Sequence, residues 1–391
     1  MPADQLARMA TAQAPQLVAD WLDITAVPAP LGAERERAEL IAGRLGGISG
    51  LADVQISDGP AGEGPNVYAR LPGVAGGQTV AVVSTLDDLE TIAALRRQPG
   101  MPLGQDGDRL VGPGVITAAI SASGIATARL LCGLSWQPAG DVVFACVSGE
   151  ETGLTGMRRF IDTRRADADT VIELLAGIGL VSFGAIGTHQ LEIRLAAEPR
   201  HSLSGGRAVV TEALARIVLA VSELTPEPDR DGHWSVLRVN TVHAGSVLNH
   251  SPADGLVTVD VRSTDAGWLA ATVAQVRILA ARVAADCGAD AQISTFRASP
   301  PVSLPGGRDN PLVRAAADAM AAHGQAAVVR AWSSSNVNVA CEAGIPGVAM
   351  EGANRGGDRG TEHEWCGVSG VISGVAASAA LIASLTTTVA R

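Results

Sequence analysis

The sequence predicts an α/β protein in which a mostly parallel, helix-flanked sheet carries an inserted α+β (ferredoxin-like) domain. At 391 residues the chain is too long for one small core, so two domains are expected. A hydrophobic content of 47% and 45 glycines fit a well-packed α/β fold with many tight turns. The apolar, β-branched run over 141–148 ends in Gly-Glu-Glu-Thr-Gly, as a buried strand does when it delivers acids to its C-terminal end.

The elements of the first domain follow from periodicity and from breakers. Helical periodicity runs over 4–24 and 33–46, and Val27-Pro28-Ala29-Pro30 separates the two segments. We then expect strands and helices in alternation: strands 66–71, 79–86, 141–148 and 170–175, and helices near 118–134 and 155–165.

The pattern changes after residue 187. Three segments alternate polar and apolar residues like half-exposed antiparallel strands, and two amphipathic helices lie between them: strands 190–195, 236–243 and 256–262, helices near 206–224 and 266–286. A proline-rich connector then leads to the last elements: helix 309–323, strands 326–331 and 346–350, and a helix from Val368. The predicted domains are therefore 1–187 with 298–391, and 188–297, an inserted domain of normal size.

Composition excludes several kinds of function. All basic residues are arginine, so a Schiff-base lysine and a phosphate-binding P-loop lysine are ruled out. A net charge of -11 argues against nucleic acid or an anionic membrane as partner. The five cysteines are scattered with no C-x-x-C pair, which favours buried thiols in a reducing compartment. We expect no secretory signal and no 18-residue apolar span, hence a cytoplasmic protein.

Two adjacent carboxylates, Glu150 and Glu151, follow the strand 141–148. Such a pair is usually a solvated loop. Its position after a core strand and before Gly-Leu-Thr-Gly favours instead a general base beside a second anionic group.

The order of short motifs along nearly the whole chain resembles the di-zinc exopeptidases of peptidase family M20, of the aminoacylase, ArgE/DapE and LysK type. The matching segments are Val83-Ser84-Thr85-Leu86-Asp87, Gly112-Pro113-Gly114-Val115, Gly149 to Gly153, His201-Ser202, Asn249 with Pro252, Val259 to Ser263, and Gly344-Ile345-Pro346. The resemblance implies a parallel-sheet catalytic domain, a lid that usually dimerises, and two zinc ions held by histidines and acids.

The ligands that the resemblance implies are largely replaced. Thr85 stands in place of the first histidine, although Asp87 is present, and Thr117 stands in place of the bridging aspartate. The next acid has only Glu173 as a nearby candidate. His363 lies a few residues from the late histidine position, where Gly360 stands, and no histidine precedes His189. Each zinc needs about four N, O or S donors, so we expect a site without metal and without any other cofactor.

The resemblance also implies substrate-binding residues. In the lid these are His201, an oxyanion-stabilising histidine that reaches a partner subunit's site, and Asn249 and Arg262, which face a substrate carboxylate. For Arg262 a surface ion pair with Asp260 or Asp265 is the alternative. In the first domain they are the hydroxyl and amide groups of Ser334, Ser335 and Asn336, with His363. Arg355 and Arg359 add an option for binding an anion.

The favoured function is a metal-independent enzyme with Glu150 as general base and Glu151, Asp87, Thr85 and Thr117 around it. Its substrate is derived from an amino acid and carried, on one hypothesis, by an acidic amino-group carrier protein in natural-product biosynthesis. The reaction is intramolecular ring closure with loss of an anion such as sulfate, as in aziridine formation, which needs positioning and a base. One alternative is a zinc-dependent aminoacylase or peptidase with an unusual ligand set. Another is an inactive subunit that binds a partner, and a homodimer or heteromer through the lid is expected.

Overall fold

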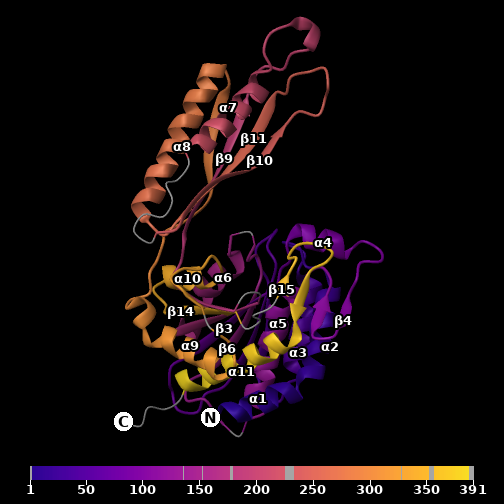
Figure 1. The fold of residues 1–391 in the computed structure, drawn as a ribbon, viewed down its shortest axis with the longest axis vertical. Helices are drawn as coiled ribbons and strands as arrows, with labels where there is room; N and C mark the ends of the chain where they lie inside the picture. The colour runs from indigo at the N-terminus through magenta and orange to yellow at the C-terminus, as the bar shows by residue number, and fades with distance from the viewer. Residues whose placement is uncertain are drawn as a thin grey trace. The chain divides into compact units, whose positions relative to one another are not determined.

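The computed structural model describes residues 2–134, 136–151, 153–176, 179–224, 233–326, 328–351 and 356–386. It divides into two compact units: unit 1 comprises Met1–Gly184 and Ser303–Arg391, and unit 2 comprises Ala185–Val302. In Figure 1 the indigo start and the yellow end of the chain both belong to unit 1, whereas unit 2 is formed by the middle of the chain. The predicted boundaries differ from these by a few residues.

Unit 1 is built on an eight-stranded sheet of order β1-β2-β6-β3-β7-β14-β8-β13. Its strands are β1 (Ala52–Ser57), β2 (Asn66–Leu71), β3 (Val80–Thr85), β6 (Val142–Val147), β7 (Thr170–Leu175), β8 (Leu180–Phe183), β13 (Val328–Arg330) and β14 (Gly347–Glu351). The four central strands β6, β3, β7 and β14 run parallel to one another. The predicted fold class, a mostly parallel sheet with helices, is confirmed.

Alternate residues of the central strands enter two apolar layers, because successive side chains of a strand point to opposite faces. On one face Val82, Phe144 and Ile172 pack with the larger set of helices, and on the other Val83, Ala145 and Val171 pack with two short helices. The larger set is α1 (Ala3–Ala12), α2 (Ala14–Ala26), α3 (Arg35–Gly46), α5 (Val115–Cys132), α9 (Pro311–Ala322) and α11 (Val368–Leu385); the short pair is α6 (Thr155–Arg164) and α10 (Val337–Glu342).

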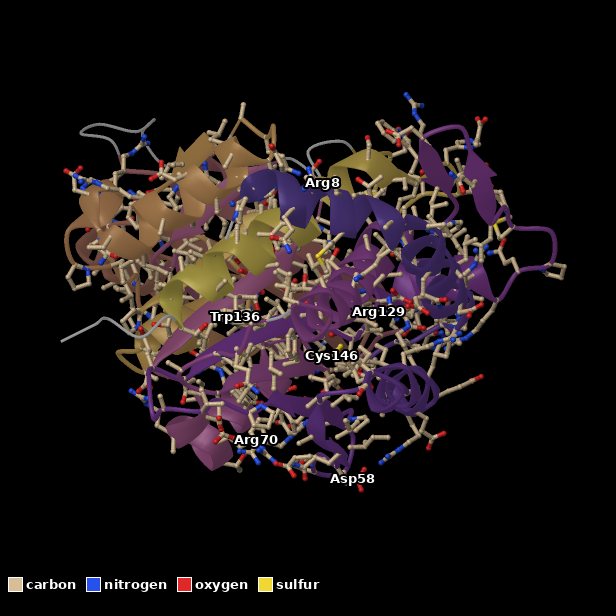
Figure 2. All side chains as sticks on the ribbon, turned by 90° about the horizontal axis from the view of Figure 1, so that it is seen from below. Arg8, Asp58, Arg70, Arg129, Trp136 and Cys146 are labelled. Atoms are coloured by element: carbon tan, nitrogen blue, oxygen red, sulfur yellow. The ribbon has the colours of Figure 1, made fainter. Side chains whose placement is uncertain are left out.

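Figure 2 shows the interior of unit 1 crowded with side chains, with Cys146 of β6 inside it and Asp58 at its margin. A further helix, α4 (Glu90–Arg96), follows β3. A small separate sheet joins distant segments: β4 (Gly104–Asp106), β5 (Arg109–Val111), β15 (Gly356–Gly357) and β16 (Trp365–Gly367).

Unit 2 is a four-stranded antiparallel sheet of order β10-β11-β9-β12 with two helices on one face. Its elements are β9 (Gly187–Ala196), α7 (Val209–Glu223), β10 (Ser235–Ala244), β11 (Asp254–Ser263), α8 (Ala266–Cys287) and β12 (Asp290–Ser299). Leu191, Ile193 and Val259 face the helices and are buried, while most of β10 is exposed. The alternation read from the sequence is that of a sheet with one solvated face.

Several details differ from the expectations. The helix predicted over 4–24 is two helices, α1 and α2, that meet at Gln13, since Pro15 in the first turn of α2 has no N–H to continue α1. The strands β1, β8 and β12 and the helices α4 and α10 were not predicted. Of these, β8, α4 and α10 are short, and the side chains of β1 and of most of β12 are partly buried or exposed.

The expectation of no 18-residue apolar span is wrong. By length and composition alone, α5, α8 and α11 are each apolar enough to cross a membrane, with mean hydropathy of 1.6, 1.3 and 1.9. In α5, 83% of that window is buried inside the fold. Aromatics are only 3% of the chain, so long Ala-, Val-, Leu- and Ile-rich helices must fill the core.

Candidate functional site

Polar side chains gather where the four parallel strands of unit 1 end. Thr85 ends β3, Glu150 follows β6, Leu175 ends β7 and Glu351 ends β14, and all four line one pocket of about 190 Å³. The carboxyl ends of parallel strands meet at one edge of a sheet, which is where open α/β sheets bind ligands. The other described lining residues are Thr117, Ile120, Glu151, Ala176, Arg330, Trp332, Ser333, Ser334, Ser335 and Arg359.

A tight turn sets the two predicted acids in place. Gly149 has a φ of 66°, and a Cβ at this position would overlap the Thr155 hydroxyl, so the turn requires glycine. The backbone N–H groups of Glu150 and Glu151 then donate to the two carboxylate oxygens of Asp87, at 2.9 and 3.2 Å. Asp87 therefore holds the turn that presents the two glutamates.

These acids lie in a site that disfavours negative charge. Burial raises the pKa of Asp87 to about 6, against the two N–H donors that lower it. Burial, and then the neighbouring charge of Glu151, raise the pKa of Glu150 well above its ordinary value, while Arg359 lowers it. Burial and the charge of Glu151 favour the protonated form of Glu150, and an approaching cation or a rise in pH favours the carboxylate, which can act as a base.

The two threonines predicted to stand in place of metal ligands line the same pocket. Thr85 is 3% exposed, and its hydroxyl accepts a hydrogen bond of 3.4 Å from the Asn336 side chain. Thr117, near the start of α5, is 1% exposed and its hydroxyl has no partner in the described chain. A buried hydroxyl without a partner costs stability, so Thr117 is free to bind a ligand.

The serine-rich loop is tied to a second buried acid, Glu173 of β7. Glu173 accepts three hydrogen bonds, from the Ser335 hydroxyl at 2.6 Å and from the backbone N–H groups of Asn336 and Val337 at 2.9 and 2.8 Å. Burial nevertheless raises its pKa to about 7. Ser334 and Ser335 also line the pocket, whereas the fully buried Asn336 is a support of the loop.

Four residues of this region were missed in the sequence. Arg330 and Trp332 lie on the pocket wall, stacked with the guanidinium 4.2 Å from the ring centre. Glu351 ends β14 in the same wall. Glu34, at the start of α3, is completely buried with no hydrogen-bond partner for either carboxyl oxygen in the described chain, and burial raises its pKa to about 7. No sequence signal separates these from ordinary strand and helix residues.

That Arg355 and Arg359 bind an anion stays a prediction. Arg359 forms an ion pair with Glu151 at 3.0 Å, and Arg355 lies outside the described residues. The predicted substrate residue His363 does not line the pocket: its side chain is 76% exposed and lies 3.4 Å from the Glu362 carboxylate.

The remaining predicted residues belong to unit 2. His201 accepts a hydrogen bond at Nδ1 from the Leu203 N–H at 3.1 Å, and its Nε2 lies 3.2 Å from the Asn249 side chain. Arg262 of β11 forms an ion pair with Asp260 at 3.0 Å. Such an ion pair is the expected alternative to a contact with the substrate. Sequence reasoning placed these residues at the substrate, and that remains a prediction.

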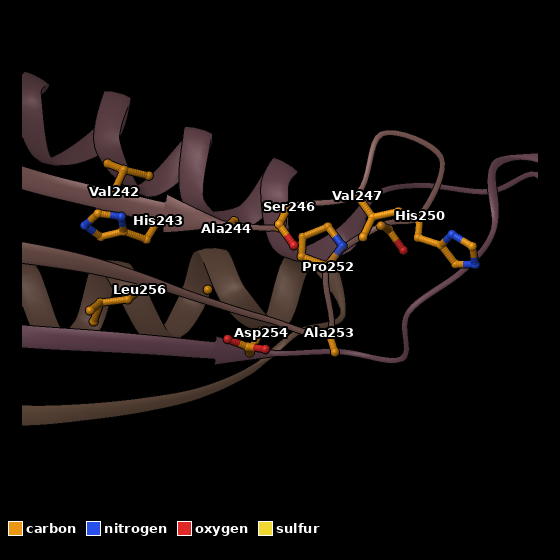
Figure 3. A pocket seen from close by; sticks show the side chains of 13 residues that line it. Val242, His243, Ala244, Ser246, Val247, His250, Pro252, Ala253, Asp254 and Leu256 are labelled. Carbon is orange, nitrogen blue, oxygen red and sulfur yellow. The ribbon is translucent and has the colours of Figure 1, made fainter.

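A larger cavity, of about 670 Å³, lies in unit 2 between the end of β10 and the start of β11 (Figure 3). His243 and Asp254 line it, and His250 lies on the loop beyond them. Its side chains are mostly exposed, and it holds none of the predicted catalytic groups. The chemistry therefore points to the smaller pocket of unit 1.

That the site holds no zinc stays a prediction, and the donor groups near Glu150 bear on it. Among the described residues no three His, Cys, Asp or Glu side chains are arranged to hold a metal ion. Both oxygens of Asp87 and both of Glu173 already accept hydrogen bonds, and Glu151 pairs with Arg359. A zinc site needs about four donors that converge on one point.

The geometry defines a class of protein: an α/β scaffold with an acid-lined pocket at the carboxyl ends of its central strands and an inserted antiparallel domain. Residues 95–384 match the peptidase family M20/M25/M40. The chain belongs to this family. No protein of curated function matches the chain at a significant level.

Many solved structures share the fold. A dipeptidase from Saccharomyces cerevisiae, Dug1p, is 13% identical with a TM-score of 0.77, and the match covers 99% of each chain. The aminopeptidase PepT from Bacillus cereus is 19% identical with a TM-score of 0.71, covering 96% of this chain and 99% of that one. YxeP from Bacillus subtilis, described as a dinuclear metal-binding peptidase, is 20% identical with a TM-score of 0.67, covering 96% and 99%.

Proposed function

We propose that this protein is an enzyme on the M20 scaffold that works without zinc and uses Glu150 to move a proton on a small, amino-acid-derived substrate. The observation that carries the proposal is the Glu150 carboxyl, held on the pocket wall by a turn whose N–H groups are bound to Asp87. Around it, hydroxyl groups stand where metal-binding side chains would be needed. The pocket, about 190 Å³, is smaller than the roughly 300–1,000 Å³ typical of drug-sized ligands.

The electrostatics favour an amine as the group that loses a proton. An ammonium that enters beside Glu150 and Glu151 offsets their repulsion and lowers the pKa of Glu150. The Glu150 carboxylate can then take a proton from that ammonium and release a nucleophilic amine. Thr85 and Thr117 present hydroxyls to the polar groups around the reacting centre.

The particular reaction we propose is ring closure. The amine nitrogen forms a bond to a nearby carbon of the same molecule as the bond from that carbon to a sulfate oxygen breaks. Sulfate leaves with the electron pair, and the ring nitrogen sheds its extra proton to solvent. Positioning the two groups supplies much of the rate, and no oxidant, reductant or Lewis acid is needed.

Replacing Glu150 tests whether it is the proton acceptor in this reaction. Glu150→Gln keeps the size of the side chain and removes the proton acceptor, so release of sulfate from 2-aminoethyl hydrogen sulfate should fall at least ~10²-fold. The exposed Glu36, changed to Gln, is the matched control and should leave the rate unchanged. A chelator should have no effect. Sulfate release that survives Glu150→Gln, or that a chelator abolishes, rejects the proposal.

A second function is zinc-dependent hydrolysis of an amide, and the comparisons favour it. The chain belongs to a peptidase family, and the structures that share its fold include peptidases, one of them described as binding two metals. Elemental analysis of the purified protein decides between the two: about two zinc ions per chain, with hydrolysis of N-acetyl amino acids, establishes the hydrolase.

Three further statements stay part of the proposal. The substrate is presented by an acidic carrier protein, the protein acts in the cytoplasm, and it assembles as a homodimer or heteromer through unit 2.

The third function, a partner-binding subunit without activity, would be shown by Glu150 and Glu151 variants that keep full biological activity.

A further inference from the structure

Two guanidinium groups line the pocket, and they differ in what they bind. Arg359 is neutralised by Glu151 at 3.0 Å. Arg330 forms no ion pair with any described residue, and neither of its terminal nitrogens donates a hydrogen bond within the described chain. Its positive charge is therefore available to a ligand.

Arg330 is also held still. Its Nε donates a hydrogen bond of 2.9 Å to the carbonyl of Trp332, and its guanidinium plane covers the Trp332 ring at 4.2 Å from the centroid. These two contacts fix one face and one nitrogen of the group. The two terminal NH₂ groups remain as a preorganised fork, the geometry that binds a carboxylate, sulfonate or phosphate through two parallel hydrogen bonds.

The pocket is lined by groups of both charges. Glu150, Glu151 and Glu351 supply acids, and Arg330 is the cation not already paired in the described lining. Glu351 attracts Arg330 without lying within ion-pair distance of it. A ligand with one positive and one negative end satisfies both kinds of group, whereas a singly charged ligand leaves one of them uncompensated.

We propose that Arg330, positioned by Trp332, is an oxyanion subsite, and that the pocket takes a small zwitterion whose ammonium faces the glutamates and whose oxyanion binds the Arg330 fork. The inference rests on the proposed function only in taking this pocket as the substrate site. Arg330 contacts the ligand, and Trp332 acts through Arg330.

Binding of small probes tests the subsite without turnover. Calorimetric titrations of the full-length protein with taurine, β-alanine and phosphoethanolamine compare a sulfonate, a carboxylate and a phosphate on the same ammonium. Ethylamine and ethyl sulfate supply one charge each. We expect saturable binding of at least one zwitterion, at least about tenfold tighter than either singly charged probe, a difference of about 1.4 kcal/mol.

Three variants and one control locate the binding. Arg330→Gln should weaken the preferred zwitterion about tenfold or more while leaving ethylamine unchanged, and Arg330→Lys, which keeps the charge but loses the fork, should fall between. Arg308→Gln, an exposed arginine of unit 1, is the matched control. Trp332→Leu should weaken the zwitterion but not ethylamine, since it frees Arg330 without removing its charge.

Absence of saturable zwitterion binding to the unmodified protein overturns the subsite, as does binding that Arg330→Gln leaves intact. Near-ultraviolet circular dichroism establishes that each variant is folded, and Arg330→Lys serves if Arg330→Gln is not. A protein that binds a zwitterion through Arg330 yet shows no Glu150-dependent turnover would reject the proposed function and leave the subsite standing.

Discussion

The buried carboxyl of Glu34 predicts that the free energy of unfolding depends on pH. Its carboxyl is buried, has no hydrogen-bond partner in the described chain, and packs so closely on Gly64 that a Cβ there would overlap it. Burial raises its pKa in the folded protein from 4.5 to about 7, with a smaller contribution from the charge of Asp87.

The sign of the pH dependence follows from that shift. Below pH 4.5 both the folded and the unfolded states hold the proton, and the stability due to this group is fully present. As the pH rises through about 7 the folded state must ionise a buried carboxyl, so that stability is lost. Between pH 5 and pH 8 the two pKa values give a loss in the free energy of unfolding on the order of 2.5 kcal/mol.

Glu34→Gln removes this titration. Urea unfolding at pH 5 and pH 8, followed by tryptophan fluorescence, should show a pH-dependent loss smaller by about 2.5 kcal/mol in the variant than in the unmodified protein. The comparison cancels the buried acids that do not interact with Glu34, and any cost of the new amide enters at both pH values. Glu36→Gln, exposed on the same helix, should keep the full dependence. If Glu34→Gln keeps it as well, the carboxyl is not buried without compensation and the reasoning fails.

The remaining predictions concern the pocket. Because Glu150 must lose its proton to act as a base, turnover should rise with pH through its raised pKa, and Arg359→Gln, which removes a neighbouring cation, should move that rise to higher pH in a pH–rate profile. Thr117→Val removes a buried hydroxyl without a described partner, so thermal unfolding should show a stability unchanged or higher by about 1 kcal/mol, while turnover falls. Zinc at 100 times the Kd of a true site would stabilise the protein by about 2.7 kcal/mol; we expect no shift in the unfolding midpoint with added zinc.

The fold and the central acids could be predicted because their signals are local. A continuous apolar strand that ends in a glycine and two glutamates puts those glutamates at the carboxyl edge of a parallel sheet. The same reasoning placed Asp87 after the neighbouring strand, and the structure joins Asp87 to the N–H groups of Glu150 and Glu151. The chain length and the change of pattern after residue 187 predicted two domains.

What could not be predicted depends on how separate segments meet. Asn336 was expected at the substrate, yet its backbone N–H binds Glu173 of a strand more than 160 residues earlier, and the side chain is completely buried. Arg330 and Trp332 form a stack because the chain turns after β13. No periodicity in the sequence predicts that turn. Glu34 lies in a charged helix start that is typical of a solvated surface, yet its side chain is buried and packs closely on Gly64.

The same buried acids of unit 1 bear on whether a metal ion binds and on which substrate binds. Burial raises the pKa values of Glu34, Asp87, Glu150 and Glu173, so each carboxylate in this region lacks full compensation for its charge. Bound dications would supply that compensation in a zinc hydrolase of this family. Under the proposed function, protons and the positive end of a substrate balance the charge instead, and the pocket would then select a substrate that carries an ammonium.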